Sequence, residues 1–162
     1  MNGLLLRSLF FTLVLLIGGA PSSAQLLSKK ALSLDAAKRI AAAAEEFARN
    51  KQWNVAVAIL DEGGNLLYFQ RMDGVQIGSI DVAMRKAESA IKFKRPSKAF
   101  SDDVSSRPQL MVLPGALAFE GGLPIVHEGD VIGAIGVSGV TAEQDGMIAQ
   151  AGLEGLSKLV SP

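Results

Sequence analysis

A run of six apolar residues at positions 55–60, followed at once by the sequence DEGGN at 61–65, constrains the fold most. The run is continuous rather than alternating and contains mostly β-branched and small residues, which indicates a strand buried on both faces. Glycine and asparagine accept positive φ, so residues 61–65 are predicted to form a tight turn. Residues 66–71 then return as the antiparallel partner, and we expect helices to cover this hairpin.

Four helices are predicted, and the first two have the apolar spacing of helices. The first begins after Ser33, a predicted N-cap, and ends near residue 50. The second begins at Ser79 and ends at about residue 95, and Ser97 is predicted to cap a short third helix that reaches about residue 104. A capping box formed by Thr141 and Gln144 opens the last helix, which runs to about residue 159.

A second hairpin is predicted near the end of the chain. Its strands cover residues 123–127 and 130–138, joined by a turn at Glu128 and Gly129. Residues 105–122 contain two prolines and three glycines, so we expect mostly loop, with one short strand near 116–119. The element order is α-β-β-α-α-β-β(β)-α, which predicts an α/β (α+β) fold with an antiparallel sheet flanked by helices.

Residues 1–24 have the pattern of a signal peptide: Arg7 near the start, about a dozen apolar residues, and small residues before a cut after Ala24. An uncleaved anchor is the alternative, but a membrane span needs roughly 20 apolar residues and Arg7 limits this run to fewer. We therefore predict a signal peptide and a single mature domain at 25–162. This domain is expected to be periplasmic or secreted, with no membrane span after cleavage.

The chain has no cysteine and one histidine, His127. The absence of cysteine excludes disulfides, thiolate metal sites, iron–sulfur clusters and a cysteine nucleophile. His127 is expected to pair with Asp130, which places Ser138 roughly 26 Å away along the strand, so a serine triad within one chain is excluded. The 16 basic and 16 acidic side chains balance, which argues against a nucleic-acid partner.

Glycines recur at every third position along the last predicted strand, at Gly133, Gly136 and Gly139. Their spacing matches neither the dinucleotide fingerprint nor the phosphate-binding loop. Glycine in a strand allows close approach either by a helix or by a ligand, and both interpretations stay open. Gly136 and Gly139 are therefore candidate ligand contacts.

Positive charge is concentrated around the end of the second predicted helix. The six basic residues surround Phe93 and are Arg85, Lys86, Lys92, Lys94, Arg95 and Lys98. One interpretation is a solvated helix face; the other is a site for carboxylates, propionates or phosphates. We take Arg85, Lys94 and Arg95 as candidate ligand contacts, together with Arg71, which could instead form a structural ion pair near Asp73.

Several segments together resemble the GlcG/HbpS family of small haem-binding or haem-degrading-type proteins. They are LSLDAA at 32–37, VAVAILD at 55–61, GGN at 63–65, RMD at 71–73, residues 83–90, RPS at 95–97, PG at 114–115, GGLPI at 121–125, GAIGVSG at 133–139 and QD at 144–145. The resemblance covers nearly all of the predicted mature domain. It implies a profilin-like or PAS-like fold, a homo-oligomer and export.

The resemblance also implies haem as a cofactor. Some relatives bind haem through a histidine just before the first helix, and others through a threonine in the loop before Pro-Gly. Those positions hold Ala31 and Gln109 in this chain. Gln109 is kept as a candidate ligand contact. His127 is a candidate replacement iron ligand if the pocket or a neighbouring subunit reaches its hairpin; alternatively, it is a tolerated polar residue beside a turn.

The leading hypothesis is an exported small-molecule-binding protein that takes haem or another anionic ligand and has no catalytic turnover of its own. The alternative is an enzyme, or an enzyme accessory, that acts on haem or a small oxidised metabolite. That alternative requires an acid–base pair, for which the sequence offers Asp61, Asp73 and Glu120 without a visible pairing.

Overall fold

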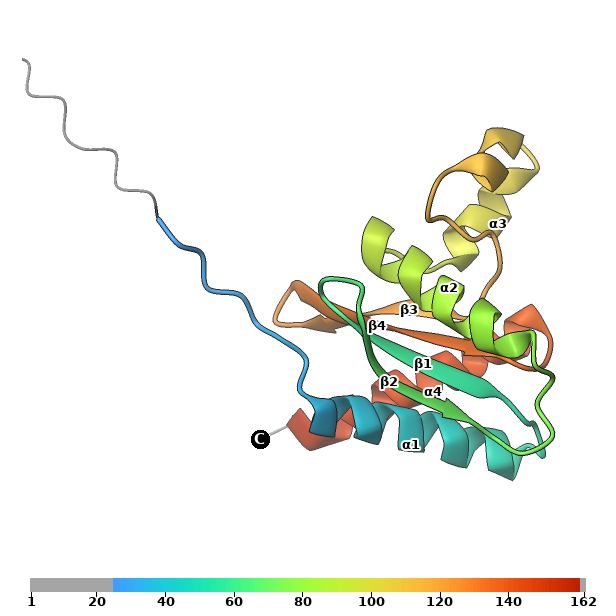
Figure 1. Ribbon diagram of the computed structural model, residues 1–162, viewed down its shortest axis with the longest axis horizontal. Coiled ribbons are helices and arrows are strands. Elements are labelled where there is room, and N and C mark those ends of the chain that lie inside the picture. The colour runs from blue at the N-terminus through green and yellow to red at the C-terminus, as the bar shows by residue number, and fades with distance from the viewer. Residues whose placement is uncertain (1–24, 161–162) are drawn as a thin grey trace, which may run out of the picture.

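In the computed structural model, which describes residues 25–160, a four-stranded antiparallel sheet lies between α1 and α4 on one face and α2 on the other (Figure 1). The sheet order is β2-β1-β4-β3. The elements are α1 (Leu34–Asn50), β1 (Ala56–Asp61), β2 (Leu66–Arg71), α2 (Ser79–Phe93), α3 (Lys98–Val104), the 3-10 helix η1 (Pro108–Val112), β3 (Gly122–His127), β4 (Asp130–Ser138) and α4 (Ala142–Val160). The predicted α+β fold is confirmed.

Both predicted hairpins are present. β1 pairs with β2 across the glycine turn and with β4 on its other side, so it lies inside the sheet and is almost entirely buried. β3 pairs with β4, and His127 lies opposite Asp130 as expected. The short strand predicted near 116–119 is wrong: residues 116–119 are irregular, and the regular element of this region is η1. Prolines at 108 and 114 break the chain into turns there.

The larger part of the core lies between the sheet and the α1–α4 layer. Strand residues such as Val57, Ile59 and Ile135 meet alanines and Ile40 of α1 and Ile148 of α4. The small side chains of α1 allow α4 to come close, and a Cβ on Gly152 of α4 would lie 3.0 Å from the carbonyl oxygen of Ile40. Burial of this apolar surface is the main stabilising contribution to the fold.

Helix α2 lies unusually close to the opposite face of the sheet. A Cβ on Gly136 would overlap the carbonyl oxygen of Ala83, and one on Gly122 would overlap that of Lys86. Gly139 lies in the same way against the backbone carbonyl of Asn54. Close packing therefore explains why these strand positions are glycine. Contact of Gly136 or Gly139 with a ligand stays a prediction.

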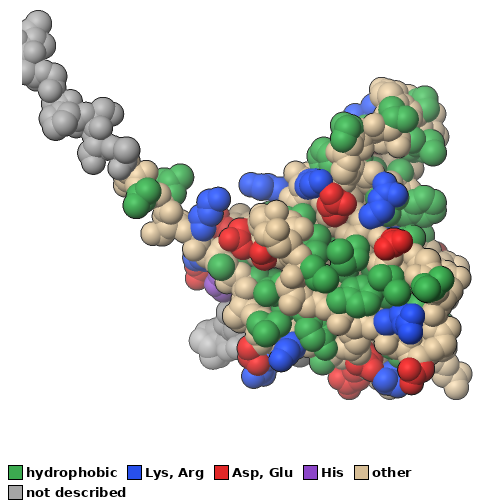
Figure 2. Space-filling view, in the orientation of Figure 1, with side chains coloured by type: hydrophobic (Ala, Val, Ile, Leu, Met, Phe, Trp, Pro, Cys, Tyr) green, Lys and Arg blue, Asp and Glu red, His purple; other side chains and the backbone are tan. Residues whose placement is uncertain are grey.

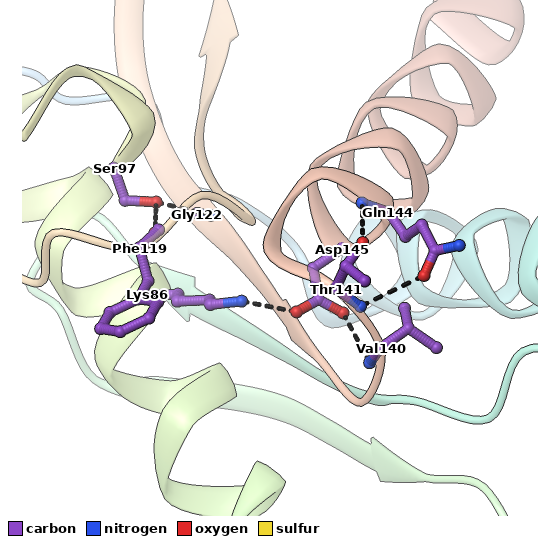
Figure 3. A network of polar contacts seen from close by, with 8 residues as sticks. All are labelled: Lys86, Ser97, Phe119, Gly122, Val140, Thr141, Gln144 and Asp145. Carbon is purple, nitrogen blue, oxygen red and sulfur yellow. Dashed lines mark hydrogen bonds and ion pairs between the residues drawn. The ribbon is translucent and has the colours of Figure 1, made fainter. Parts of the chain in front are cut away.

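Three helix starts were predicted from capping residues, and two of these caps form. The Ser33 hydroxyl accepts from the Ala36 amide at 3.2 Å, and Thr141 and Gln144 exchange two hydrogen bonds (Figure 3). Ser97 occupies the predicted N-cap position of α3, but its side chain makes no capping hydrogen bond. Its hydroxyl instead donates to the carbonyl of Phe119 and accepts from the amide of Gly122, so it fixes the chain that enters β3.

Residues 98–115 form an arm that projects from the body of the domain (Figure 1). Apolar side chains lie on the surface of this arm (Figure 2). Met111 and Val112 of η1 are exposed. The signal-peptide prediction concerns residues 1–24 and lies outside the described residues. Across residues 25–160, no helix is long and apolar enough to span a membrane.

Candidate functional site

A cavity of about 220 Å³ lies at the end of the sheet where the two hairpin turns come together. Four segments form it: the chain ahead of α1, the β1–β2 turn, the end of α2 and the start of β4. We call it the lysine pocket, and its lining residues are Ser28, Lys29, Lys30, Glu62, Ile91, Lys94, Asp130 and Val131. Basic and acidic side chains gather where the N-terminal segment reaches the body of the domain (Figure 2).

Local backbone geometry sets the walls of the lysine pocket. Lys94 ends α2 in the left-handed conformation, with φ 51°, and its amide donates to the carbonyls of Ala90 and Ile91. The β1–β2 turn is held by Asp61, whose carboxylate accepts from the amides of Gly63 and Asn65 at 2.9 and 2.8 Å. These contacts fix the backbone positions from which the side chains of Lys94 and Glu62 extend. The pocket is therefore formed by the ends of regular elements.

The same hydrogen bonds explain the acidity of Asp61. Desolvation by itself would raise the pKa of this carboxyl, but the hydrogen bonds from Asn65 and Gly63 outweigh it and lower the pKa. A carboxylate that is committed to a turn in this way is a poor general base. Asp61 therefore acts in turn structure, and it forms no acid–base pair with the other two carboxylates that the sequence offered.

The lysine pocket combines three ammonium groups with two carboxylates. Lys30 forms an ion pair with Glu128 of the β3–β4 turn. Lys29 and Lys94 are exposed and, within residues 25–160, form no ion pair. An exposed ammonium without a fixed partner is free to meet an anionic ligand, and Ile91 and Val131 supply an apolar wall beside it. The pocket is therefore suited to a carboxylate or phosphate attached to an apolar body.

Haem fits this pocket in part. The lysines could hold its propionates, but the lining contains no histidine, cysteine, methionine or tyrosine that could ligate iron. His127 lies opposite the lining residue Asp130, with its side chain 35% exposed and 3.9 Å from the carboxylate of Glu128. Among residues 25–160 there is no group of three or more potential metal-ligating side chains. The residues fit the acidic edge of a haem but not its iron.

The volume of the lysine pocket also indicates that only the acidic edge of a haem would fit inside it. Drug-sized ligands occupy clefts of roughly 300–1,000 Å³, and 220 Å³ is smaller than this range. A small anion would fill the cavity. A large planar ligand would place only its charged edge inside, with the rest against the neighbouring surface.

The other predicted contacts are spread over the molecule. Arg71 and Gly139 lie at the opposite end of the sheet, because Ala56 at the start of β1 pairs with both Arg71 and Ser138. Arg85 is exposed on α2, and the guanidinium of Arg95 lies 3.8 Å from the centre of the Phe100 ring. Gln109 is exposed on η1. Of the predicted ligand contacts, the lysine pocket includes Lys94 alone.

The basic residues around α2 do not form one surface. Lys86 is buried, with 2% of its side chain exposed, and pairs with Asp145 at 2.6 Å. Lys92 pairs with Glu88 on the same helix. Lys98 pairs with Asp102 on α3 and with Glu120 in the loop that leads into β3. The sequence shows that these charges are close along the chain, but not that Lys86, Lys92 and Lys98 pair with different acids.

Sequence reasoning missed Ser28, Lys29 and Lys30, because a segment without helical or strand periodicity gave no reason to place them near α2. It also missed the burial of Lys86. That signal was present: Lys86 lies three residues after Ala83 and next to Ala87, on the apolar stripe of its own helix. A charged residue on such a stripe indicates a buried partner elsewhere in the chain.

The fold and the pocket define a class: a small α+β domain with an antiparallel sheet and a cationic cavity at one sheet end. The chain belongs to the HbpS-like family, described as haem degrading protein HbpS-like, whose family model matches residues 32–154. The predicted recognition is confirmed. Residues 28–30 precede the matched range, so the family model does not cover the two N-terminal lysines of the pocket.

Three relatives illustrate the match. Protein GlcG of Escherichia coli K12 is 36% identical over 112 residues, which span 68% of this chain and 84% of GlcG. A double mutant of HbpS from Streptomyces reticuli has a TM-score of 0.76 at 32% identity, over 89% of this chain and 99% of that one. The crystal structure of a PduOC:heme complex has a TM-score of 0.72 at 30% identity, over 78% and 95%.

Proposed function

We propose that this chain is an exported binding protein for an anionic small molecule, held in the lysine pocket, and that haem is a ligand of this class. The observation that carries the proposal is the convergence of Lys29, Lys30 and Lys94 on one cavity. Family membership and the haem complex of PduOC support haem as the ligand. The pocket also adjoins Ala31, the position where the family resemblance implies an iron ligand.

Each part of the pocket has a distinct role in the proposed complex. Lys29 and Lys94 attract and hold carboxylates, while Ile91 and Val131 exclude water from one side of the ligand. Lysine is a flexible point charge without a fixed two-point geometry, so recognition depends on charge and shape. When bound, haem supplies an iron centre for electron transfer or oxygen chemistry. The residues of this pocket hold the ligand and leave the iron without a side-chain ligand from the lining.

Binding should therefore depend on the propionates and not on the iron. The test is a titration of residues 25–162 with hemin, iron-free protoporphyrin IX and protoporphyrin dimethyl ester, followed by absorbance and by fluorescence quenching. We expect hemin and protoporphyrin IX to bind with similar affinity and the ester to bind at least about tenfold more weakly. The double variant Lys29→Met/Lys94→Met should bind both hemin and protoporphyrin IX with an affinity at least about tenfold lower.

The matched control is Lys38→Met, which removes an exposed lysine of α1 outside the pocket. It should bind as the parent chain does. Equal binding of the ester, or unchanged binding by the double variant, would refute the site. If hemin alone binds and the affinity is lost in His127→Ala, the iron and not the propionates determines binding.

Export and self-association are further parts of the proposal. Export is supported by the signal-peptide pattern at residues 1–24, and N-terminal sequencing of the protein recovered from a bacterial periplasm should begin at Gln25. The family resemblance supports a homo-oligomer, which light scattering on residues 25–162 tests. The enzymatic alternative predicts loss of the haem absorbance and release of iron when a reductant is added to the complex, whereas simple binding leaves both unchanged.

A further inference from the structure

Two grooves lie at the other end of the sheet, away from the lysine pocket. Their volumes are about 650 and 350 Å³, and they share Lys98 and Glu120, whose ammonium and carboxylate are 3.3 Å apart. We call them the paired grooves. The larger is lined also by Ser101, Ala118, Phe119, Ala142 and Glu143, and the smaller by Pro96, Gly121, Gly122, Leu123, Gly146, Met147 and Gln150. An ion pair thus divides two hollows.

Glu120 is held in place by its surroundings. Its side chain is 24% exposed and lies against the first turns of α4, where a Cβ on Gly146 would be only 2.5 Å from its Oε1. Glycine at position 146 therefore makes room for this carboxylate. Lys98 lies on its outer side and Lys86 acts on it electrostatically from the interior. Glu120 therefore has a cation on each side.

Buried polar contacts beside the groove residues join α2, α4 and the chain that enters β3, and we call them the base of the grooves (Figure 3). Lys86 points from α2 to Asp145 at the start of α4, and Asp145 also accepts from the amide of Val140 at 3.2 Å. Gly121 has φ 121°, and a Cβ there would lie 2.8 Å from the Nζ of Lys86. The hydroxyl of Ser97 fixes the same strand entry. Three of the segments that carry the family resemblance, 83–90, 121–125 and 144–145, meet at this base.

The charged groups at the surface of the grooves can exchange their ion pair for contacts with a ligand. Lys98 is half exposed, and its hydrogen bonds to Asp102 and Glu120 raise its pKa, so it stays protonated. An ion pair in contact with water contributes little to stability, so a ligand with both charges can replace it at small cost. The larger groove adds the carboxylate of Glu143 and the ring of Phe119, which is 58% exposed.

We propose that the larger of the paired grooves binds a zwitterionic small molecule with an apolar body, of the α-amino acid class. The carboxylate meets Lys98, and the ammonium meets Glu120 with Glu143 beside it. The apolar body packs on Phe119. The volume of about 650 Å³ lies inside the range usual for small-molecule sites. This site is independent of the lysine pocket, which binds a net anion at the other end of the sheet.

The test uses three probes that differ by one charge: L-phenylalanine, phenethylamine, which lacks the carboxylate, and 3-phenylpropanoate, which lacks the ammonium. Amide NMR spectra of residues 25–162 are recorded during each titration. We expect L-phenylalanine to shift the amides of residues 118–121 and 142–143 in a saturable way. The amine and the acid should each bind at least about tenfold more weakly.

Two variants locate the charges, and two controls separate this site from the rest of the molecule. Lys98→Met and Glu120→Gln should each lower the affinity for L-phenylalanine by at least about tenfold, with the circular dichroism spectrum unchanged. Lys38→Met and Lys94→Met should bind it normally, while Lys94→Met still affects the porphyrins. Absence of shifts at 118–121, equal binding of a singly charged probe, or normal binding by Lys98→Met would overturn the proposal. If Glu120→Gln does not fold, the three-probe comparison on the parent chain decides alone.

Discussion

The lysine pocket and the paired grooves are built at opposite ends of one sheet, from different kinds of structure. The lysine pocket lies beside the hairpin turns, and its charges come from exposed side chains at the ends of elements. The paired grooves lie over a buried ion pair that joins α2 to α4. The exposed side chains of the lysine pocket can therefore be replaced without disturbing the fold, whereas the base of the grooves is part of the fold.

The largest effect should come from breaking the buried pair under the grooves. Lys86 and Asp145 expose 2% and 3% of their side chains, so Lys86→Met leaves an uncompensated buried carboxylate. Removal of one partner from a buried pair costs about 3–5 kcal/mol. We therefore expect the free energy of unfolding, measured in urea, to fall by about this amount.

The double variant separates pairing from simple loss of packing. Replacing both members, as Lys86→Met/Asp145→Leu, removes the desolvation cost together with the attraction and should be less destabilising than Lys86→Met alone. A double variant that is at least as unstable as the single one would show that the pair does not act as a unit. Lys94→Met is the matched control in the other region and should stay within about 0.5 kcal/mol of the parent chain.

The next effect concerns Gly136 of β4, which faces α2. Gly136→Ala would force a methyl group into the carbonyl of Ala83, and overpacking of this kind costs about 1–3 kcal/mol. Gly78→Ala is the control, because a Cβ at Gly78 meets nothing within 4 Å. Thermal unfolding of both variants checks the difference. An unchanged stability in Gly136→Ala, with loss of porphyrin binding, would favour the ligand-floor interpretation of this glycine.

A third difference should appear in the dependence on salt. The lysine pocket is proposed to attract a net anion through exposed ammonium groups, and such attraction is screened over about 8 Å at physiological ionic strength. The paired grooves are proposed to bind a molecule of zero net charge. Affinity for protoporphyrin IX should therefore fall more steeply with sodium chloride than affinity for L-phenylalanine. Parallel slopes in the two titrations would remove the electrostatic distinction between the regions.

The sequence predicted the fold well because its signals act over short distances. The glycine turn at 61–65, the Thr141–Gln144 capping box and the spacing of the alanines on α2 each determine structure within a few residues. The sites depend on long-range contacts: Lys86 and Asp145 are 59 residues apart, and Lys29 reaches Lys94 only after the chain has folded. The missing side-chain cap at Ser97 has the same origin, because the Ser97 hydroxyl donates to the carbonyl of Phe119 and makes no bond to its own helix.

The smallest expected effect concerns the turn beside the lysine pocket, and it measures how much the Asp61 carboxylate contributes to stability. Hydrogen bonds from the Asn65 and Gly63 amides lower the pKa of Asp61 against the opposing effect of desolvation. A lowered pKa in the folded state means that Asp61 stabilises the protein above its unfolded-state pKa. This contribution is lost as the pH falls through the folded-state pKa. In urea unfolding, the stabilities of the parent chain and of Asp61→Asn should therefore differ at neutral pH by less than the Lys86→Met effect. The two stabilities should converge as the pH falls below the unfolded-state pKa and through the lowered folded-state pKa of Asp61. Asp73→Asn, which changes an exposed acid just beyond β2, is the control. A gap that stays constant with pH would mean that the charge of the Asp61 carboxylate does not contribute to stability.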